Sequence, residues 1–385
     1  MKVLSVFGTR PEAIKMAPVV KEIESCSALQ SITCVTGQHR SMLDQVLSLF
    51  DIKPDYDLSV MEHNQTLNRL SARIMEKIDD VLAVARPDCV LVHGDTTTAM
   101  AVSIAAFHRN IKVGHVEAGL RTYNMSQPWP EEFNRRLIDV SASYLFAPTQ
   151  KTAHNLESEG VYGQIFITGN TVIDALKQTA YSIKNDLQLQ NDLGSSFSFL
   201  DSSRRLLLVT GHRRESFGDG FIEICRALKT LALRTDLQIV YPVHLNPNVR
   251  RPVYEYLDGI SNIHLIEPQT YLAFVYLMNR ADIILTDSGG VQEEAPSLGK
   301  PVLVMRDVTE RPEAAQAGVV RLVGTNVENI IAEVERLLDD SVYYESLSRI
   351  LNLYGDGRAA QRISAALLGK MPDPFISSGI ETHIS

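Results

Sequence analysis

The sequence predicts an α/β fold of two doubly wound domains, each built on a parallel sheet. Three observations predict this fold class. The chain has 385 residues, more than one ordinary hydrophobic core accommodates. Short runs of Val, Ile and Leu alternate with helical patterns along most of its length, which is typical of parallel sheets covered by helices on both faces. A polar, poorly periodic stretch then divides two similar halves.

In the first half, each predicted strand is a continuous apolar run that ends at a turn residue. The strands, with the helices that follow them, are Val3–Phe7 with Pro11–Glu24, Cys89–His93 with Thr98–Phe107, and then the strands Lys112–Val116 and Tyr144–Ala147. In open α/β sheets, ligands bind outside the carboxyl ends of the strands. We therefore look for functional residues directly after these runs.

The second half repeats the rhythm. Its strands and helices are Leu206–Thr210 with Ile222–Ala232, Ile239–Val243 with Val249–Leu257, Ile263–Ile266 with Leu272–Asn279, Ile283–Thr286 with Val291–Leu298, and the strand Val302–Met305. The polar stretch Lys184–Ser203 is interpreted as a connection into this sheet. We place the domain boundary earlier, near Gly169-Asn170, which gives domains of residues 1–169 and 170–385. A last helix around Arg358–Leu368 is compatible with packing on either domain, including back on the first.

Composition narrows the class of protein. With 45% apolar and 22% charged residues the chain is a typical globular protein, and its net charge of −9 argues against a nucleic-acid partner. The four cysteines form no CxxC pair, which predicts reduced thiols and no metal site. The first apolar run ends at Phe7, too early for a signal-peptide core or a membrane span. We therefore expect a cytoplasmic protein without a membrane partner.

Cations follow the first predicted strand. Gly8 permits a tight turn, and Pro11 suits the first turn of a helix, where its missing N–H is no loss. Arg10 and Lys15 then flank a helix N-terminus, a position that favours anions. The alternative is an ordinary strand–helix turn with solvated cations. The segment is neither the three-glycine dinucleotide fingerprint nor a Walker loop.

A glycine pair follows a strand of the second half. Ser288-Gly289-Gly290 lies between the strand Ile283–Thr286 and a helix, and it allows backbone N–H groups to approach a phosphate. Glu294, one turn later, can accept hydrogen bonds from ribose hydroxyls. The alternative for Glu294 is a carboxylate that complements the helix dipole.

More basic residues leave the carboxyl ends of neighbouring strands. His212 and Arg213 follow the strand Leu206–Thr210, and Arg311 follows another strand. His212 can donate a hydrogen bond to a phosphate oxygen or assist a leaving group. A basic surface cluster is the alternative. Together with the glycine pair, these residues predict a diphosphate site on the second domain.

The first domain contributes acids instead. Asp95 and Glu117 each come directly after a buried strand, and Glu131 stands near the start of a helix. The alternative for Asp95 is a helix N-cap, and acids are common in first turns. Three acids at one sheet edge nevertheless favour acid–base chemistry on a sugar attached to the diphosphate.

With these segments assembled, the chain resembles the bacterial non-hydrolysing UDP-N-acetylglucosamine 2-epimerases. The resemblance runs nearly end to end, through GTRPEAIKMAP, HGDTTTAMA, GHVEAGLRT, PWPEEFNRR, TGHRRESFG, YPVHLNPNV, TDSGGVQEEAPSLGKPVLVMR and ERPEA. It implies two Rossmann-like domains facing across a cleft (the GT-B type), a homodimer, and neither metal nor redox cofactor. The implied activity equilibrates UDP-GlcNAc with UDP-ManNAc, which supplies surface polysaccharide synthesis.

The resemblance also implies roles for individual residues. The catalytic set is Asp95, Glu117, Glu131 and His212, in which the carboxylates perform the acid–base steps. Nucleotide and diphosphate contacts come from Arg10, Lys15, His212, Ser288, Gly289, Gly290, Glu294 and Arg311, and the uracil is held by Gln269 and Phe274. A second, activating substrate site is formed by Gln38, His39, Gln65, Arg135, Arg213, Glu215 and His244. Gly37 stands where the family more commonly has alanine, which would loosen that loop.

This chemistry explains why several carboxylates are needed. The C2 hydrogen of GlcNAc has no adjacent carbonyl, so the C1–O bond must break first to make it acidic. A carboxylate then takes the proton, UDP re-adds to the resulting glucal, and a proton returns to the opposite face. Our hypothesis is that Asp95 and one of Glu117 or Glu131 divide these roles. A hydrolysing epimerase, a glycosyltransferase of the same fold and an inactive nucleotide-sugar binder are the alternatives.

Overall fold

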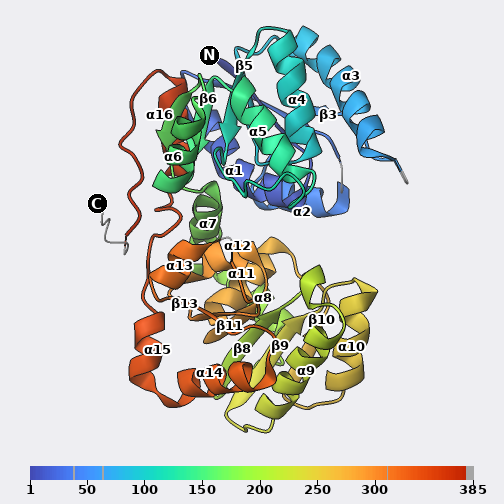
Figure 1. Ribbon diagram of the computed structural model, residues 1–385, viewed down its shortest axis with the longest axis vertical. Helices are drawn as coiled ribbons and strands as arrows, with labels where there is room; N and C mark the ends of the chain where they lie inside the picture. The colour runs from blue at the N-terminus through green and yellow to red at the C-terminus, as the bar shows by residue number, and fades with distance from the viewer. Residues whose placement is uncertain (38–39, 63–64, 310, 379–385) are drawn as a thin grey trace. The chain divides into compact units, whose positions relative to one another are not determined.

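The computed structural model describes residues 1–37, 40–62, 65–309 and 311–378. It divides into two compact units, each with its own sheet (Figure 1). The first unit consists of Met1–Lys177 and Tyr354–Ser377, and the second of Gln178–Leu353 with Ser378. The chain therefore leaves the first unit within helix α7 (Thr171–Asn185) and returns to it at Tyr354.

Over the described residues, the first sheet has seven parallel strands. Their order is β3 (Tyr56–Asp57), β2 (Gln30–Val35), β1 (Lys2–Phe7), β4 (Cys89–His93), β5 (Lys112–Val116), β6 (Tyr144–Ala147) and β7 (Gln164–Ile167). The order reverses between β1 and β4, so the sheet has a switch point at the carboxyl ends of these two strands. Ligands of open α/β sheets bind in the crevice that such a reversal leaves.

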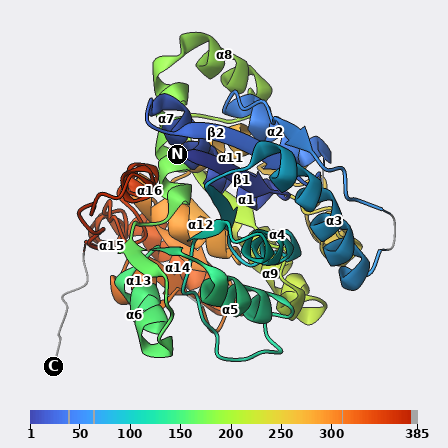
Figure 2. The same ribbon diagram turned by 90° about the horizontal axis from the view of Figure 1, so that it is seen from above.

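Helices cover both faces of the first sheet (Figure 2). One face carries α3 (Leu67–Ala85), α4 (Thr97–His108), α5 (Glu131–Ser141) and α6 (Gln150–Glu159), and the other carries α1 (Arg10–Ser25), α2 (Arg40–Leu49) and α16 (Ala359–Leu367). Strand β1 serves both cores, since Leu4 and Val6 face one and Val3 and Phe7 the other. This two-residue alternation is why its whole length reads as an apolar run.

The second sheet has the same plan. Among the described residues it has six parallel strands, in the order β10 (Ile263–Ile266), β9 (Leu237–Pro242), β8 (Arg205–Thr210), β11 (Ile283–Thr286), β12 (Val302–Val304) and β13 (Val320–Leu322). Its switch point lies between β8 and β11. The prediction of two doubly wound parallel sheets is therefore confirmed.

The second sheet is likewise covered by helices. They are α8 (Leu187–Ser196), η1 (Arg214–Ser216), α9 (Asp219–Leu231), α10 (Pro247–Leu257), α11 (Tyr271–Arg280), α12 (Gly289–Glu294), η2 (Ala295–Leu298), α13 (Pro312–Gln316), α14 (Val327–Asp339) and α15 (Ser341–Leu347). The core on one face joins the strands to α9, α10 and α14.

Two segments assigned from the sequence have a different structure, and the strands β2, β3, β7 and β13 were not among those expected. The stretch Lys184–Ser203 contains α8, whose first turn is capped because the Asp186 side chain accepts from Leu189 N–H at 3.0 Å. The helix expected over Val291–Leu298 is α12 followed by the 3-10 helix η2. Pro296 lies at this change and has no N–H with which to continue an α-helix.

The last helix belongs to the first unit. Helix α16 packs against α1 (Figure 1), and its Ile363 is fully buried in the core that α1 shares with the sheet. Asp174 of α7 caps it, accepting from the N–H groups of Ala359 at 3.2 Å and Ala360 at 2.8 Å. Burial raises the pKa of the Asp174 carboxyl to about 6, although those two N–H groups oppose the shift.

The sequence also predicts reduced thiols and no membrane-spanning segment. All four cysteines are free, and Cys34, Cys89 and Cys225 are buried. Burial raises the pKa of each of these three thiols to about 12, so they are inert at neutral pH. Over the part of the chain that the structure describes, no helix combines the length and apolar character needed to cross a bilayer.

Candidate functional site

Most of the predicted catalytic and diphosphate-binding residues lie near the switch point of one of the two sheets. In the first unit they follow β1, β4 and β5, which are neighbours in the sheet. In the second unit they follow β8, β11 and β12, which are also neighbours. Because the strands are parallel, the carboxyl ends within each set meet at one edge. Each unit therefore presents a cluster of its own.

The turn after β1 is built around Glu12, a residue to which we had assigned no role. Its carboxylate accepts from the N–H groups of Gly8 and Thr9 at 3.1 and 2.7 Å, and Thr9 completes a capping box at the start of α1. The other oxygen accepts from Thr96 Oγ1 at 2.7 Å. A side chain at Gly8 would meet Thr36 Oγ1 at 2.0 Å. Glu12 thus joins the turns that carry Arg10 and Asp95.

Lys15 lies one turn into α1 and contacts a predicted catalytic acid. Its Nζ is 2.5 Å from Glu117 Oε1, and both side chains are nearly buried. The sequence associated Lys15 with the diphosphate. The structure brings it to the carboxylate that follows β5.

Glu117 is held on several sides. Its Oε1 also accepts from Asn170 Nδ2 at 3.1 Å, and its Oε2 is 3.3 Å from His93 Nε2. Its backbone is left-handed, with φ of +70°, which is unusual for a glutamate and typical of strained functional positions. Burial by itself would raise the pKa of Glu117, but Lys15 and His93 outweigh it and hold the pKa well below its ordinary value. Glu117 is therefore a carboxylate at neutral pH.

Asp95 follows β4 at the turn formed by Gly94. Thr96 caps α4 by accepting from Ala99 N–H at 3.0 Å, so the alternative reading of Asp95 as that cap is wrong. The Asp95 carboxylate instead forms an ion pair with Arg135 of α5. Arg135 was expected in the activating site, and here it serves the acid after β4.

Glu131 and its neighbour have different environments. Glu131 begins α5 and is half-buried. Glu132 is fully buried and accepts from the N–H groups of Thr122 and Tyr123 at 3.0 and 3.1 Å and from Arg135 at 3.3 Å. Glu132 therefore anchors the loop before α5, a role that the sequence did not reveal.

A buried charge network supports the same edge. His115 Nδ1 is 2.6 Å from Asp139, and its Nε2 is 2.7 Å from the carbonyl oxygen of Gly94. Asp139 also pairs with Arg121 at 2.7 Å. Because these groups contact one another, the turns after β4 and β5 are held in a common frame.

In the second unit, Asp287 organises the turn after β8. The buried carboxylate accepts from the N–H groups of His212 and Arg213 at 2.7 and 2.8 Å, and it is 3.3 Å from His212 Nδ1. Burial lowers the pKa of His212, nearby Arg213 and His244 add to the effect, and Asp287 opposes it. The imidazole is therefore neutral at neutral pH and offers an N–H donor.

The glycine pair lies under a cation. The Arg311 guanidinium sits above Gly289, where an added Cβ would lie 2.9 Å from its Cζ. Its Nε donates to Glu293 Oε1 at 2.7 Å. Glu294 is buried and accepts from Tyr271 Oη at 2.9 Å, which ties α12 to the start of α11. Ser288, the glycines, Glu294 and Arg311 are thus brought together.

The residues expected around uracil flank the start of α11. Gln269 Nε2 donates to the carbonyl oxygen of Glu267 at 2.6 Å, and Thr270 caps the helix. Phe274 lies one turn into α11 and is half-buried. Tyr271 connects this end of the helix to Glu294 of the glycine-pair cluster.

The residues of the expected activating site fall in both units. In the second unit, Glu215 pairs with Arg306 at 2.5 Å, and the His212 and His244 rings stack with centroids 5.6 Å apart. In the first unit, Gln65 lies beside Arg73 at 3.4 Å. Gln38 and His39 lie outside the described residues. Gly37 has a φ of +69°, a left-handed backbone that favours glycine over alanine.

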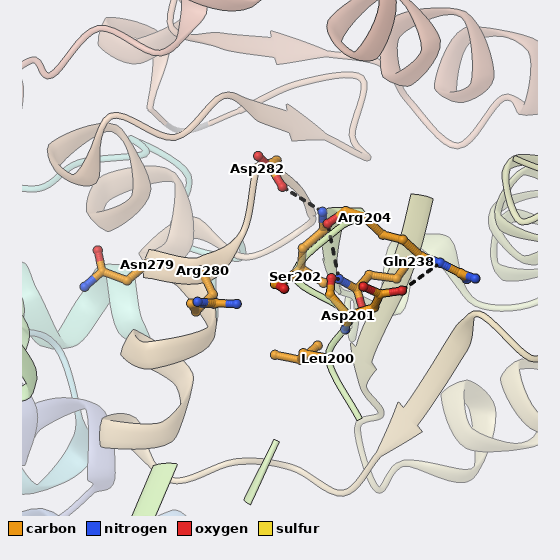
Figure 3. Close-up of a pocket in the computed structure, with 9 residues that line it drawn as sticks. Leu200, Asp201, Ser202, Arg204, Gln238, Asn279, Arg280 and Asp282 are labelled. Carbon is orange, nitrogen blue, oxygen red and sulfur yellow. Dashed lines mark hydrogen bonds and ion pairs between the residues drawn. The ribbon is translucent and has the colours of Figure 1, made fainter. Parts of the chain in front are cut away.

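A separate hollow of about 350 Å³ lies at the amino ends of the strands of the second sheet, opposite the carboxyl ends that carry the predicted residues (Figure 3). It contains none of the predicted site residues, and several of its polar groups bind one another. Gln238, for example, donates to the carbonyl oxygen of Asp201 at 2.7 Å and accepts from its N–H at 2.9 Å. Among the described residues, no cluster of His, Cys, Asp and Glu could hold a metal ion.

Comparisons with known proteins agree with this arrangement. A family model described as UDP-N-acetylglucosamine 2-epimerase matches residues 21–368. The UDP-N-acetylglucosamine 2-epimerase of Escherichia coli strain K12 is 58% identical over 369 residues, which cover 95% of this chain and 98% of that relative.

Solved structures show the same fold. The Neisseria meningitidis UDP-GlcNAc 2-epimerase bound to UDP-GlcNAc is 52% identical, with a TM-score of 0.89 over 96% of this chain and 100% of that one. The Methanocaldococcus jannaschii UDP-GlcNAc 2-epimerase in complex with UDP-GlcNAc and UDP is 33% identical, with a TM-score of 0.79 and coverage of 96% and 100%. The predicted fold of two Rossmann-like domains on parallel sheets and the family resemblance are both confirmed. The chain therefore belongs to the UDP-N-acetylglucosamine 2-epimerase family.

Proposed function

We propose that this chain catalyses the reversible epimerisation of UDP-GlcNAc to UDP-ManNAc at C2 without hydrolysing the substrate. The observation that carries the proposal is a pair of carboxylates, Asp95 and Glu117, at the ends of neighbouring strands, each in contact with a cation. The relatives named above support it, since two of them were solved with UDP-GlcNAc.

The reaction proceeds by elimination and re-addition. The C1–O bond breaks with its electron pair leaving on UDP, while a carboxylate takes the C2 proton and a C1–C2 double bond forms. UDP oxygen then attacks C1 of this glucal, and a proton is delivered to the other face of C2. No electron or co-reactant is gained or lost. The developing positive charge at C1 is what makes the C2–H acidic enough for a carboxylate to remove.

The acid–base roles fall to Asp95 and one of Glu117 or Glu131. Glu117 suits a proton acceptor because Lys15 and His93 hold it ionised. An acid and a base are needed on different faces of C2, and carboxylates in unequal surroundings supply this. His212, with a neutral imidazole, donates to an oxygen of the departing diphosphate.

The second unit binds the nucleotide. Backbone N–H groups at Ser288, Gly289 and Gly290 and the Arg311 guanidinium stabilise the diphosphate as negative charge develops on it. Glu294 accepts from ribose hydroxyls, and Gln269 and Phe274 hold the uracil. Arg10 is a further proposed cation for the diphosphate.

The decisive experiment is incubation with UDP-GlcNAc in heavy water, followed by NMR. The expected product is UDP-ManNAc with deuterium at C2, because the abstracted proton exchanges with solvent before it returns. Unlabelled substrate without product would refute the proposal. Release of free ManNAc and UDP would identify a hydrolysing epimerase. Transfer of the sugar to an added acceptor would identify a glycosyltransferase.

The proposal extends to the oligomeric state and to activation by substrate, both as the family resemblance implies. We propose a cytoplasmic homodimer, for which the free thiols are consistent with a reducing compartment. Gln38, His39, Gln65, Arg135, Arg213, Glu215 and His244 form a second, activating UDP-GlcNAc site. Sedimentation velocity tests the dimer. Initial rates with UDP-ManNAc, measured with and without a trace of UDP-GlcNAc, test the activation.

A further inference from the structure

Asn170 stands beside the catalytic edge, although the sequence pointed to it only as a domain boundary. It follows β7 and precedes α7, and it is buried. Its side-chain Nδ2 donates to Glu117 Oε1 at 3.1 Å, and its Oδ1 accepts from Val172 N–H at 3.0 Å. A carboxylate can only accept and a backbone N–H can only donate, so these partners fix the amide orientation chemically.

The backbone around Asn170 is fixed by the returning C-terminal segment. The Asn170 N–H donates to the carbonyl oxygen of Tyr354 at 2.6 Å, the residue at which the chain re-enters the first unit. Arg362 of α16 donates to the carbonyl oxygen of Thr168 at 3.0 Å. Gly169 is left-handed, with φ of +84°, and an added Cβ would lie 3.3 Å from Gly355 Cα. The Asn170 side chain therefore starts from a rigid base.

We infer that Asn170 is a positioning residue of the reaction, which holds the Glu117 carboxylate in its working orientation and ties it to the returning segment. This inference rests on the proposed role of Glu117. Asn170 and Lys15 share Oε1, while Oε2 points to the other side, 3.3 Å from His93 Nε2. Oε2 is also 3.7 Å from the position of a Cβ on Gly94, the residue before Asp95. The arrangement leaves Oε2 to exchange the proton.

Two substitutions separate this role from a purely structural one. Asn170→Asp keeps the oxygen that accepts from Val172 N–H. It replaces the amide N–H that donates to Glu117 with a carboxylate oxygen, which repels Glu117. Asn170→Ala removes both contacts. Thr171→Val is the matched control, because the buried Thr171 hydroxyl next to Asn170 has no hydrogen-bond partner among the described residues.

We expect Asn170→Asp to lower kcat about 100-fold at neutral pH, with KM for UDP-GlcNAc changed less than about 3-fold, since small displacements of a reacting group have this effect. Activity should partly recover at lower pH, where the two carboxylates share a proton. Asn170→Ala should lower kcat about 10-fold without that recovery. Thr171→Val should stay within about 2-fold of the unsubstituted enzyme. If Asn170→Ala does not fold, the result for Asn170→Asp alone tests the positioning role.

A readout without turnover keeps this test independent of the proposed function. In protein labelled with ¹³C at the glutamate carboxyl, the Glu117 signal is assigned by its loss in Glu117→Gln. Its titration should move to higher pH in Asn170→Asp, and not in Thr171→Val. An unchanged titration, or kcat within about 3-fold of normal in a folded Asn170→Asp enzyme, would overturn the inference. Absence of deuterium exchange in the unsubstituted enzyme would instead count against the proposed function.

Discussion

At the scale of single residues, the carboxylates that hold the turns of the first unit in place and those proposed to react are the same residue types, Asp and Glu. Glu131 and Glu132 are adjacent, yet only Glu132 fastens a loop through backbone N–H groups. Glu12 and Asp287 are fixed in the same way. The sequence located Asp95, Glu117 and Glu131 at strand or helix ends. It could not separate anchoring acids from reacting ones, because that difference lies in contacts made by distant segments.

The proposed acids are tested by Asp95→Asn, Glu117→Gln and Glu131→Gln. Each is expected to slow deuterium incorporation at C2 by roughly 100- to 10,000-fold, the usual contribution of a positioned acid or base. UDP binding, measured by calorimetry, should remain largely intact because most of the proposed nucleotide contacts are in the second unit. Glu76→Gln, exposed on α3, is the control and should exchange at the normal rate. Near-normal exchange in all three site variants would refute the assigned roles.

Gly289 gives a steric prediction. A methyl group there would lie 2.9 Å from Arg311 Cζ, and Glu293 restrains the guanidinium from moving away. We expect Gly289→Ala to weaken UDP binding about 10-fold, the cost of one displaced charged contact. Gly194→Ala is the matched control in α8, where the nearest atom would be 3.8 Å away. It should bind UDP normally, and equal affinities for the two variants would contradict the prediction.

At the scale of elements, the apolar runs predicted strands well because both faces of each sheet are covered. Five expected strands, such as Cys89–His93, have the expected bounds in the structure. Three more differ from them by a single residue. Short edge strands such as β3 and β13 carry little apolar signal. Helix α8 was missed because it is polar and depends on the Asp186 cap.

The contact between α7 and α16 makes stability depend on pH. The pKa of Asp174 is raised to about 6 in the folded protein from an ordinary value of 3.8. The folded state therefore binds this proton more tightly, and the associated stability is present below pH 4 and lost as pH rises through 6. Relative to Asp174→Asn, the unfolding free energy should fall by about 3 kcal/mol over that window. Urea unfolding at several pH values checks this, and parallel curves for the two proteins would contradict it.

At the scale of the whole molecule, the sequence indicated two similar halves but not how the chain returns. The sequence of α16 predicts an amphipathic helix. Its apolar face does not indicate which of the two domains the helix packs against. The structure assigns it to the first unit through Ile363 and through the Asp174 cap. The glycine-pair cluster and the cluster of carboxylates in the first unit were predictable for a different reason. Parallel strands bring residues that follow them to one edge.

The division into units predicts local effects of core substitutions. Ile363→Ala in α16 should destabilise the first unit by about 2–5 kcal/mol, as for other large-to-small core changes. In hydrogen exchange, amides of β1 and α1 should lose protection while those of β8 and β9 keep theirs. Ile330→Ala in α14, equally buried in the core of the second unit, should give the reverse pattern. Loss of protection in both units from either change would contradict the division.

Because the first unit is completed by Tyr354–Ser377, its synthesis is interrupted by that of the second. On the ribosome, β1 to β7 emerge first but wait for α16, whereas Gln178–Leu353 is complete before that helix is made. The order of folding should therefore reverse the order of translation. Nascent chains stalled with residues 1–353 outside the exit tunnel should be protease-resistant in the second sheet and sensitive in the first. Equal resistance would mean that the first sheet forms without its last helix.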